Sequence, residues 1–145
     1  MRKKEGTLLH APAKDLRSLG NFVIEIRSTS RGKLPPLPFE KIARQILGAR
    51  YQLSLVVCGN SLSRTINIKY RHKRYIPNVL SFPLRTHEGE IFLNPHVAAR
   101  EAKRFGVTFR ARLTLLFVHG CLHLKGTRHG PEMEALEERM VKKFS

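Results

Sequence analysis

The chain of 145 residues contains only two cysteines, and no apolar run approaches the ~20 residues that span a bilayer. Cys58 and Cys121 cannot build a disulfide framework, and they fit a reducing compartment. The basic first residues, MRKKEG, are not followed by the apolar core of a secretory signal. These absences argue against a membrane-spanning or disulfide-rich secreted protein, and we expect a cytoplasmic protein with no membrane partner.

Acidic residues are also scarce. Lys and Arg number 27 against 11 Asp and Glu, which gives a formal net charge of +16. So basic a chain attracts polyanions, and the phosphate backbone of nucleic acid is the first candidate partner, before an anionic membrane surface. The hydrophobic share of 41% argues against a disordered chain, and the length suits one compact domain.

Hydrophobic periodicity predicts one α+β domain over residues 21–145, preceded by a flexible basic arm at residues 1–20. Alternating or continuous apolar residues predict strands at 21–27, 51–58, 78–84 and 91–93. Apolar residues at helical spacing predict helices at 39–47, 61–70, 95–105, 109–125 and from 131 towards residue 145. Because strands and helices are interspersed, we expect a small mixed β-sheet of about four strands packed with about five helices.

Local features sharpen this prediction. Pro83 places its strand near a sheet edge or a strand end, because proline cannot donate to the hydrogen-bond ladder. Residues 87–90 are expected to form the turn of a hairpin that leads into the last strand. Ile26 is expected on the inward face of the first strand, and Phe105 is expected to be buried by its helix.

Three histidines lie close together in the segment HGCLHLKGTRH, residues 119–129. His119 and His123 are four residues apart, so on a helix they project from one face. Gly126 favours a helix stop, because glycine adopts the left-handed conformation freely, and the chain can then return His129 to the other two. Three imidazoles with a fourth position for water are typical of catalytic zinc. The segment therefore predicts a metal site at the end of a buried central helix.

The spacing leaves alternatives open. Histidines at a helix end are often ordinary polar residues rather than ligands. In metalloproteases with this spacing a glutamate follows the first histidine as general base, whereas Gly120 follows His119 here. Peptide hydrolysis by that route therefore lacks its base, and Gly120 indicates close backbone packing beside the site.

Two segments resemble the YbeY family of metal-dependent endoribonucleases, which mature ribosomal RNA. Residues 119–129 resemble the family pattern HGxLHLxGYDH, whose three histidines bind the metal. Residues 70–83, YRHKRYIPNVLSFP, resemble its Tyr-Arg pair followed by Val-Leu-Ser-Phe-Pro. Residues 89–91, Gly-Glu-Ile, stand where the family has Gly-Asp-Ile. The order of elements also agrees from about residue 21 to the C-terminus.

The resemblance implies a single-strand-specific, metal-dependent endoribonuclease that uses one divalent ion, with Zn²⁺ first among the candidates. His119, His123 and His129 would be its ligands, and a metal-bound water or a ribose 2′-hydroxyl would attack the phosphodiester. The implied substrate is ribosomal RNA, with the ribosome or its proteins as partners. The implied roles are formation of the 3′ end of the small-subunit rRNA and late ribosome quality control.

Cationic residues in the second segment are candidates for contacting the substrate. Arg71 is expected to offset charge on the phosphoryl oxygens, since a guanidinium matches two phosphate oxygens and is always charged. Without the resemblance, Arg71 would count as a solvated residue at a helix end. The candidates for RNA binding are Lys69, Lys73, Arg74 and Ser81, although a basic run is most often just a solvated surface.

The chain departs from the family pattern at Thr127 and Arg128, which replace Tyr-Asp before the third histidine. The carboxylate of that aspartate could orient a metal ligand, which an arginine cannot do, so Glu132 is a candidate to substitute for the aspartate.

Two other functions remain open. One is a non-catalytic, metal-stabilised ribosome-assembly factor that binds RNA without cutting it. The other, disfavoured by Gly120, is a metalloprotease-like hydrolase.

Overall fold

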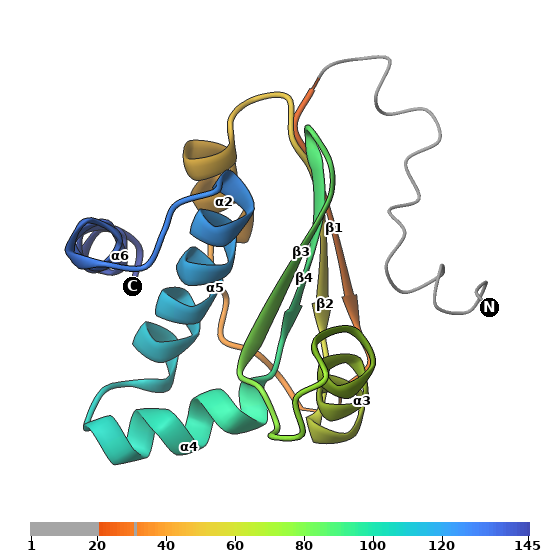
Figure 1. Cartoon of the computed structure of the whole chain (residues 1–145). Coiled ribbons are helices and arrows are strands. Elements are labelled where there is room, and N and C mark those ends of the chain that lie inside the picture. The colour runs from red at the N-terminus through yellow and green to blue at the C-terminus, as the bar shows by residue number, and fades with distance from the viewer. Residues whose placement is uncertain (1–20, 31) are drawn as a thin grey trace.

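The computed structural model describes residues 21–30 and 32–145, so the arm predicted at residues 1–20 lies outside the described residues. The described residues form one four-stranded sheet and five helices in a single α+β domain, as predicted. Helices α2 (Phe39–Leu47) and α5 (Phe109–Lys125) cover one face of the sheet, and α3 (Asn60–Arg71) packs on part of the other (Figure 1). The domain therefore has two hydrophobic clusters, one on each face.

The sheet is mixed, with strand order β1-β2-β4-β3. Strands β1 (Val23–Ser28), β2 (Gln52–Val57) and β4 (Glu88–Leu93) run parallel, and β3 (Val79–Arg85) pairs antiparallel with β4. Pro83 lies in β3 at the sheet edge, as its missing N–H requires. The crossover helix α2 connects β1 to β2, which makes their parallel pairing possible.

The central helix is α5, which contacts β3, β4, α2, α4 (Pro95–Phe105) and α6 (Pro131–Phe144). Buried residues occupy nearly every side of its middle turns, which is typical of an interior helix. Thr108 caps the first turn by accepting a hydrogen bond from the Ala111 N–H, and Gly126 ends the helix with a φ of 95°. Among the described residues no single helix is long and apolar enough to cross a membrane, and one bent helix pair passes only by length and composition.

Three local predictions were wrong. Residues 88–90, expected in a turn, belong to β4, and the turn is confined to Thr86 and His87. Phe105, the last residue of α4, is 50% exposed, and its ring lies beside the guanidinium of Arg112 instead of in the core. Ile26 is 49% exposed because β1 is an edge strand of the sheet.

Strand β4 begins three residues earlier than predicted, and it therefore buries two carboxyl groups, those of Glu88 and Glu90. Glu90 is 0% exposed, and its Oε2 accepts hydrogen bonds from Ser54 Oγ at 2.9 Å and from Arg27 Nη2 at 3.2 Å. Burial raises the pKa of Glu90 to about 7, although the Ser54 hydrogen bond and the Arg27 charge both oppose this rise. The folded protein therefore holds a proton on Glu90 at pH values where the unfolded chain releases it.

Replacing Glu90 by glutamine is expected to stabilise the protein increasingly as pH rises. The folded-state pKa lies above the unfolded value of 4.5, so the stability that the protonated carboxyl contributes is lost as pH rises towards about 7. Between pH ~4.5 and ~7.5 the difference in unfolding free energy should shift in favour of the variant by roughly 1–3 kcal/mol, because each unit of pKa corresponds to about 1.4 kcal/mol. Urea unfolding of both proteins across this pH range measures the difference. Glu40→Gln, at an exposed position of α2, is the control, and a constant difference at all pH values would contradict the prediction.

Candidate metal centre and its cavity

His119 and His123 project from the C-terminal turns of α5 on one face, as their spacing predicts. Their Nε2 atoms are 3.0 Å apart. After the left-handed turn at Gly126, the chain returns His129 so that its ring centroid lies 5.2 Å from that of His119 and 4.6 Å from that of His123. One nitrogen from each of the three rings lies within 4.8 Å of the others. The structure therefore brings the three predicted ligands together.

The donor set fits one divalent ion. Two nitrogens bound at ~2.0–2.1 Å to a tetrahedral ion lie about 3.3 Å apart, which is close to the observed separation of the His119 and His123 Nε2 atoms. A metal binds the neutral imidazole, and burial lowers the pKa of His123, which the neighbouring His119 and His129 lower further. Three ring nitrogens that face one another are better explained by one shared cation than by ordinary polar histidines at a helix end.

A carboxylate from α6 touches this cluster. Glu137 Oε2 contacts Nδ1 of His119, and the two side chains are only 13% and 27% exposed. Glu132, which the sequence suggested as the carboxylate that orients a metal ligand, lies exposed in the first turn of α6. Sequence reasoning missed Glu137, although its spacing from the buried Met133 and Met140 places it on the inward face of α6.

The three histidines line a cavity of about 510 Å³. Its other walls come from the end of α3, the following loop and β3, and consist of Arg71, Tyr75, Asn78, Val79, Leu80, Ser81 and Pro83. The structure thus places Arg71 and Ser81 in the same cavity as the histidines. Lys69, Lys73 and Arg74 are exposed at the end of α3 and in the loop after it, and they do not line the cavity.

Arg71 is the last residue of α3, which His72 closes in the left-handed conformation with a φ of 59°. Arg71 Nη1 donates to Asn67 Oδ1 at 3.3 Å and to Tyr75 Oη at 3.1 Å. Within the described part of the chain these are its hydrogen bonds, so Nε and Nη2 keep their donors for a ligand. Tyr75 is 55% exposed and lines the same cavity, so an aromatic ring lies next to the guanidinium. In the sequence, Tyr75 lies beside the basic run of residues 69–74, and such a mix of cations and aromatic rings can grip phosphates and stack bases.

Gly120 allows α5 to lie close against β3, two of whose cavity-lining residues, Val79 and Ser81, face this glycine. A Cβ atom at this position would lie 3.0 Å from Ser81 Oγ and 3.3 Å from Val79 Cγ2. Ser81 Oγ also donates a hydrogen bond to the Gly120 carbonyl at 3.0 Å. The close backbone packing predicted for Gly120 is therefore present, and the Ser81 hydroxyl ties the edge strand to the histidine-bearing helix.

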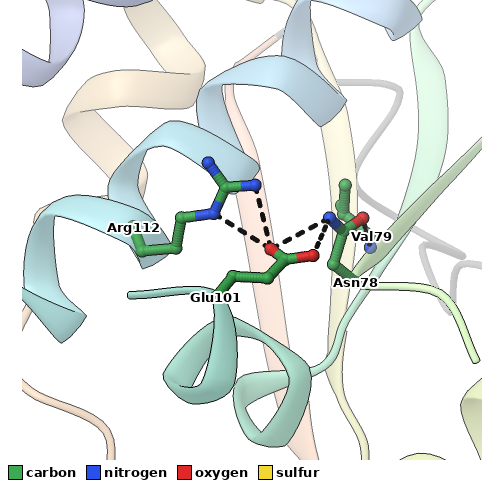
Figure 2. A network of polar contacts seen from close by, with 4 residues as sticks. All are labelled: Asn78, Val79, Glu101 and Arg112. Atoms are coloured by element: carbon green, nitrogen blue, oxygen red, sulfur yellow. Dashed lines mark hydrogen bonds and ion pairs between the residues drawn. The ribbon is translucent and has the colours of Figure 1, made fainter. Parts of the chain in front are cut away.

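A polar network joins the start of β3 to α4 and α5 (Figure 2). Asn78 Nδ2 donates to both carboxylate oxygens of Glu101, at 3.2 and 3.1 Å, and Asn78 Oδ1 accepts the Val79 N–H at 2.7 Å. Arg112 Nε donates a hydrogen bond to Glu101 Oε1 at 2.9 Å, and Arg112 Nη2 forms an ion pair with the same oxygen at 2.9 Å. Because Arg112 lies on α5 about two turns before His119, the network holds the histidine-bearing helix against the strand that forms another wall of the cavity.

Comparison with known proteins gives a family match over most of the chain. The model of the YbeY family, described as endoribonuclease YbeY, matches residues 25–145. Endoribonuclease YbeY of Geobacter metallireducens is 36% identical over 116 residues, which cover 71% of this chain and 77% of the relative. Endoribonuclease YbeY of Geobacter sulfurreducens is 32% identical over 136 residues, which cover 83% of this chain and 91% of the relative.

A solved structure agrees with the fold. The solution structure of TM1509 from Thermotoga maritima superposes with a TM-score of 0.60 at 23% sequence identity, covering 83% of this chain and 87% of that chain. At this identity the likeness concerns the fold alone. The match to the family model and the identity to the two Geobacter relatives show that the chain belongs to the YbeY family of endoribonucleases.

Proposed function

We propose that this protein is a single-strand-specific endoribonuclease that uses one divalent ion, with Zn²⁺ first among the candidates. The observation that carries the proposal is the meeting of three imidazoles and Arg71 in one cavity. The imidazoles support metal-assisted chemistry, the guanidinium supports a phosphate-bearing substrate, and the net charge of +16 supports a polyanion. Family membership supports RNA as that polyanion.

The side chains of the cavity divide into those that hold the ion and those that hold the substrate. His119, His123 and His129 supply neutral nitrogen ligands, a set that suits Zn²⁺. Arg71 binds the scissile phosphate through Nε and Nη2 and stabilises the charge that grows on its oxygens. The attacking oxygen comes from water or from a ribose 2′-hydroxyl. When bound, the divalent ion supplies Lewis-acid chemistry, either on a phosphoryl oxygen or on water.

The cavity suits an unpaired strand. Tyr75 presents an exposed ring beside Arg71, and a base reaches such a ring only when it has left a duplex stack. Ser81 contributes a hydroxyl oxygen to the cavity wall. Outside the cavity, Lys69, Lys73 and Arg74 extend positive charge from the end of α3, and we assign them to the RNA backbone on either side of the cleaved bond.

Family membership extends the proposal to the cellular substrate. We infer that the RNA is ribosomal, that the cleavage contributes to forming the 3′ end of the small-subunit rRNA, and that the enzyme also acts in late ribosome quality control in the cytoplasm. The ribosome or its proteins are then the partners, and the strongly basic surface supports binding to so large a polyanion.

Metal removal tests the proposed function. Protein purified without chelator is expected to carry about one zinc per chain and to cleave a single-stranded RNA oligonucleotide but not the same sequence in a duplex. Dialysis against a chelator should abolish cleavage, and added Zn²⁺ should restore it. Stoichiometric metal without metal-dependent cleavage would instead identify an RNA-binding assembly factor. Metal-dependent turnover of a peptide would revive the metalloprotease alternative.

A further inference from the structure

One polar contact of the metal centre comes from a helix that carries none of its ligands. Oε2 of Glu137, on α6, contacts Nδ1 of His119, on α5. The carboxylate lies on the inward face of its helix, since Met133 and Met140, four residues before and three after it, are 1% and 8% exposed. A carboxylate at such a position is costly to bury unless it has a partner, and His119 is that partner.

The contact decides which nitrogen of His119 faces the cavity. An ionised carboxylate has only acceptors, so Nδ1 of His119 carries the hydrogen and donates it to Glu137. The lone pair then lies on Nε2, the atom that is 3.0 Å from Nε2 of His123. A contact of this kind sets both the tautomer and the orientation of an imidazole ring.

The other two histidines lack such an anchor. Among the described residues, no carboxylate contacts the ring of His123 or His129, and the guanidinium of Arg128, next to His129, cannot accept a hydrogen bond. The Glu137 side chain is only 13% exposed, so little water competes for its contact with His119. Low exposure strengthens a hydrogen bond to a charged acceptor, so this one contact is well placed to hold the ligand set.

We propose that Glu137 is a positioning residue of the metal centre, which acts through His119 by holding its Nε2 towards the site shared by the three histidines. The proposal rests on the metal site of the proposed function and adds a residue from α6 to it. Partners of this kind typically contribute 10–100-fold to metal affinity. Docking of α6 on α5 is then part of forming the site.

The test compares Glu137→Gln and Glu137→Ala with two controls that remove a carboxylate from exposed positions of the same helix, Glu132→Gln and Glu138→Gln. Zinc affinity is measured by competition with a chromogenic chelator, and circular dichroism checks that each variant is folded. Glu137→Ala removes the acceptor and is expected to bind Zn²⁺ about 10–100-fold more weakly than the wild type, whereas Glu137→Gln keeps a neutral oxygen acceptor and should lose less affinity. The controls should stay within about twofold of the wild type. Wild-type affinity in the folded Glu137→Ala variant would overturn the proposal.

A second readout does not depend on metal or activity. Nitrogen-15 NMR of the metal-free protein, at a pH above the usual histidine range, reports the tautomer of His119. The wild type is expected to show the Nδ1–H tautomer, and Glu137→Ala should shift the ring towards Nε2–H. A wild-type ring with its hydrogen on Nε2 would refute the positioning role. A wild type that shows the Nδ1–H tautomer but never cleaves RNA would refute the proposed function and leave the role of Glu137 standing.

Discussion

Replacing His123 by alanine is expected to remove metal binding and RNA cleavage together while the fold survives. His123 supplies one of the three converging nitrogens, and its Nε2 faces that of His119. Since even a residue that only hydrogen-bonds a metal ligand contributes 10–100-fold to affinity, loss of a direct ligand should weaken metal binding by more than ~100-fold. The core should persist because the buried Cys121 and Leu122 of the same turn are unchanged.

Three measurements on the His123→Ala variant separate the possible functions. They are metal content, cleavage of single-stranded RNA, and binding of the same RNA under conditions that prevent cleavage. His96→Ala is the matched control, because His96 is an exposed histidine at the start of α4 and does not line the cavity. If the protein is an enzyme, His123→Ala loses turnover and His96→Ala keeps it. If His123→Ala lost its metal but kept full cleavage, the metal-dependent mechanism would be wrong.

The elements of this fold were predictable because the local signals agreed with the tertiary structure. The helix at 109–125 combines a Thr cap, a continuous apolar centre and the Gly126 stop, and the structure has the same bounds. The convergence of the histidines followed from their spacing and from that stop. In each case neighbouring residues along the chain carried the information, so no knowledge of distant contacts was needed.

The errors came from residues whose surroundings are set by distant parts of the chain. Glu88 and Glu90 are polar and flank a glycine, which is typical of a turn, but pairing with β2 and β3 makes them strand residues and buries them. Ser54 and Arg27, from two other strands, donate hydrogen bonds to Oε2 of Glu90, and no local pattern predicts these contacts. Glu137 was missed for the same reason, since its partner His119 lies on another helix.

Some residues of the cavity were predictable from the sequence, and others were not. Arg71 and Ser81 were candidates from the second family-like segment, and the structure places both of them on the cavity wall with the histidines. Lys69 and Lys73 were candidates because of their charge, and neither lines the cavity. Lys69 lies on α3 two residues before Arg71 and so projects from another side of the helix, whereas Lys73 lies in the loop after it. Charge predicts a partner for a surface, whereas the placement of one side chain depends on the packing of its helix.

The second large effect is expected at Arg71. Replacing it by alanine should lower the turnover of saturating RNA by about 10²–10³-fold, the range for removing one group that stabilises developing charge in a transition state. Metal content should stay at the wild-type level, since Arg71 lines the cavity without being one of the metal-binding nitrogens. Arg71→Lys keeps the charge but loses the paired donors, so its turnover should fall between those of the wild type and the alanine variant.

Arg74→Ala is the matched control, because it removes the same guanidinium from an exposed position three residues away and outside the cavity. Its effect should appear in KM and in the salt dependence of RNA binding, with turnover at saturation unchanged, since a backbone contact binds ground state and transition state alike. Steady-state kinetics at two salt concentrations separates the two positions. Equal losses of turnover in both variants would mean that the guanidiniums act through general attraction of RNA, and that Arg71 has no special part at the scissile phosphate.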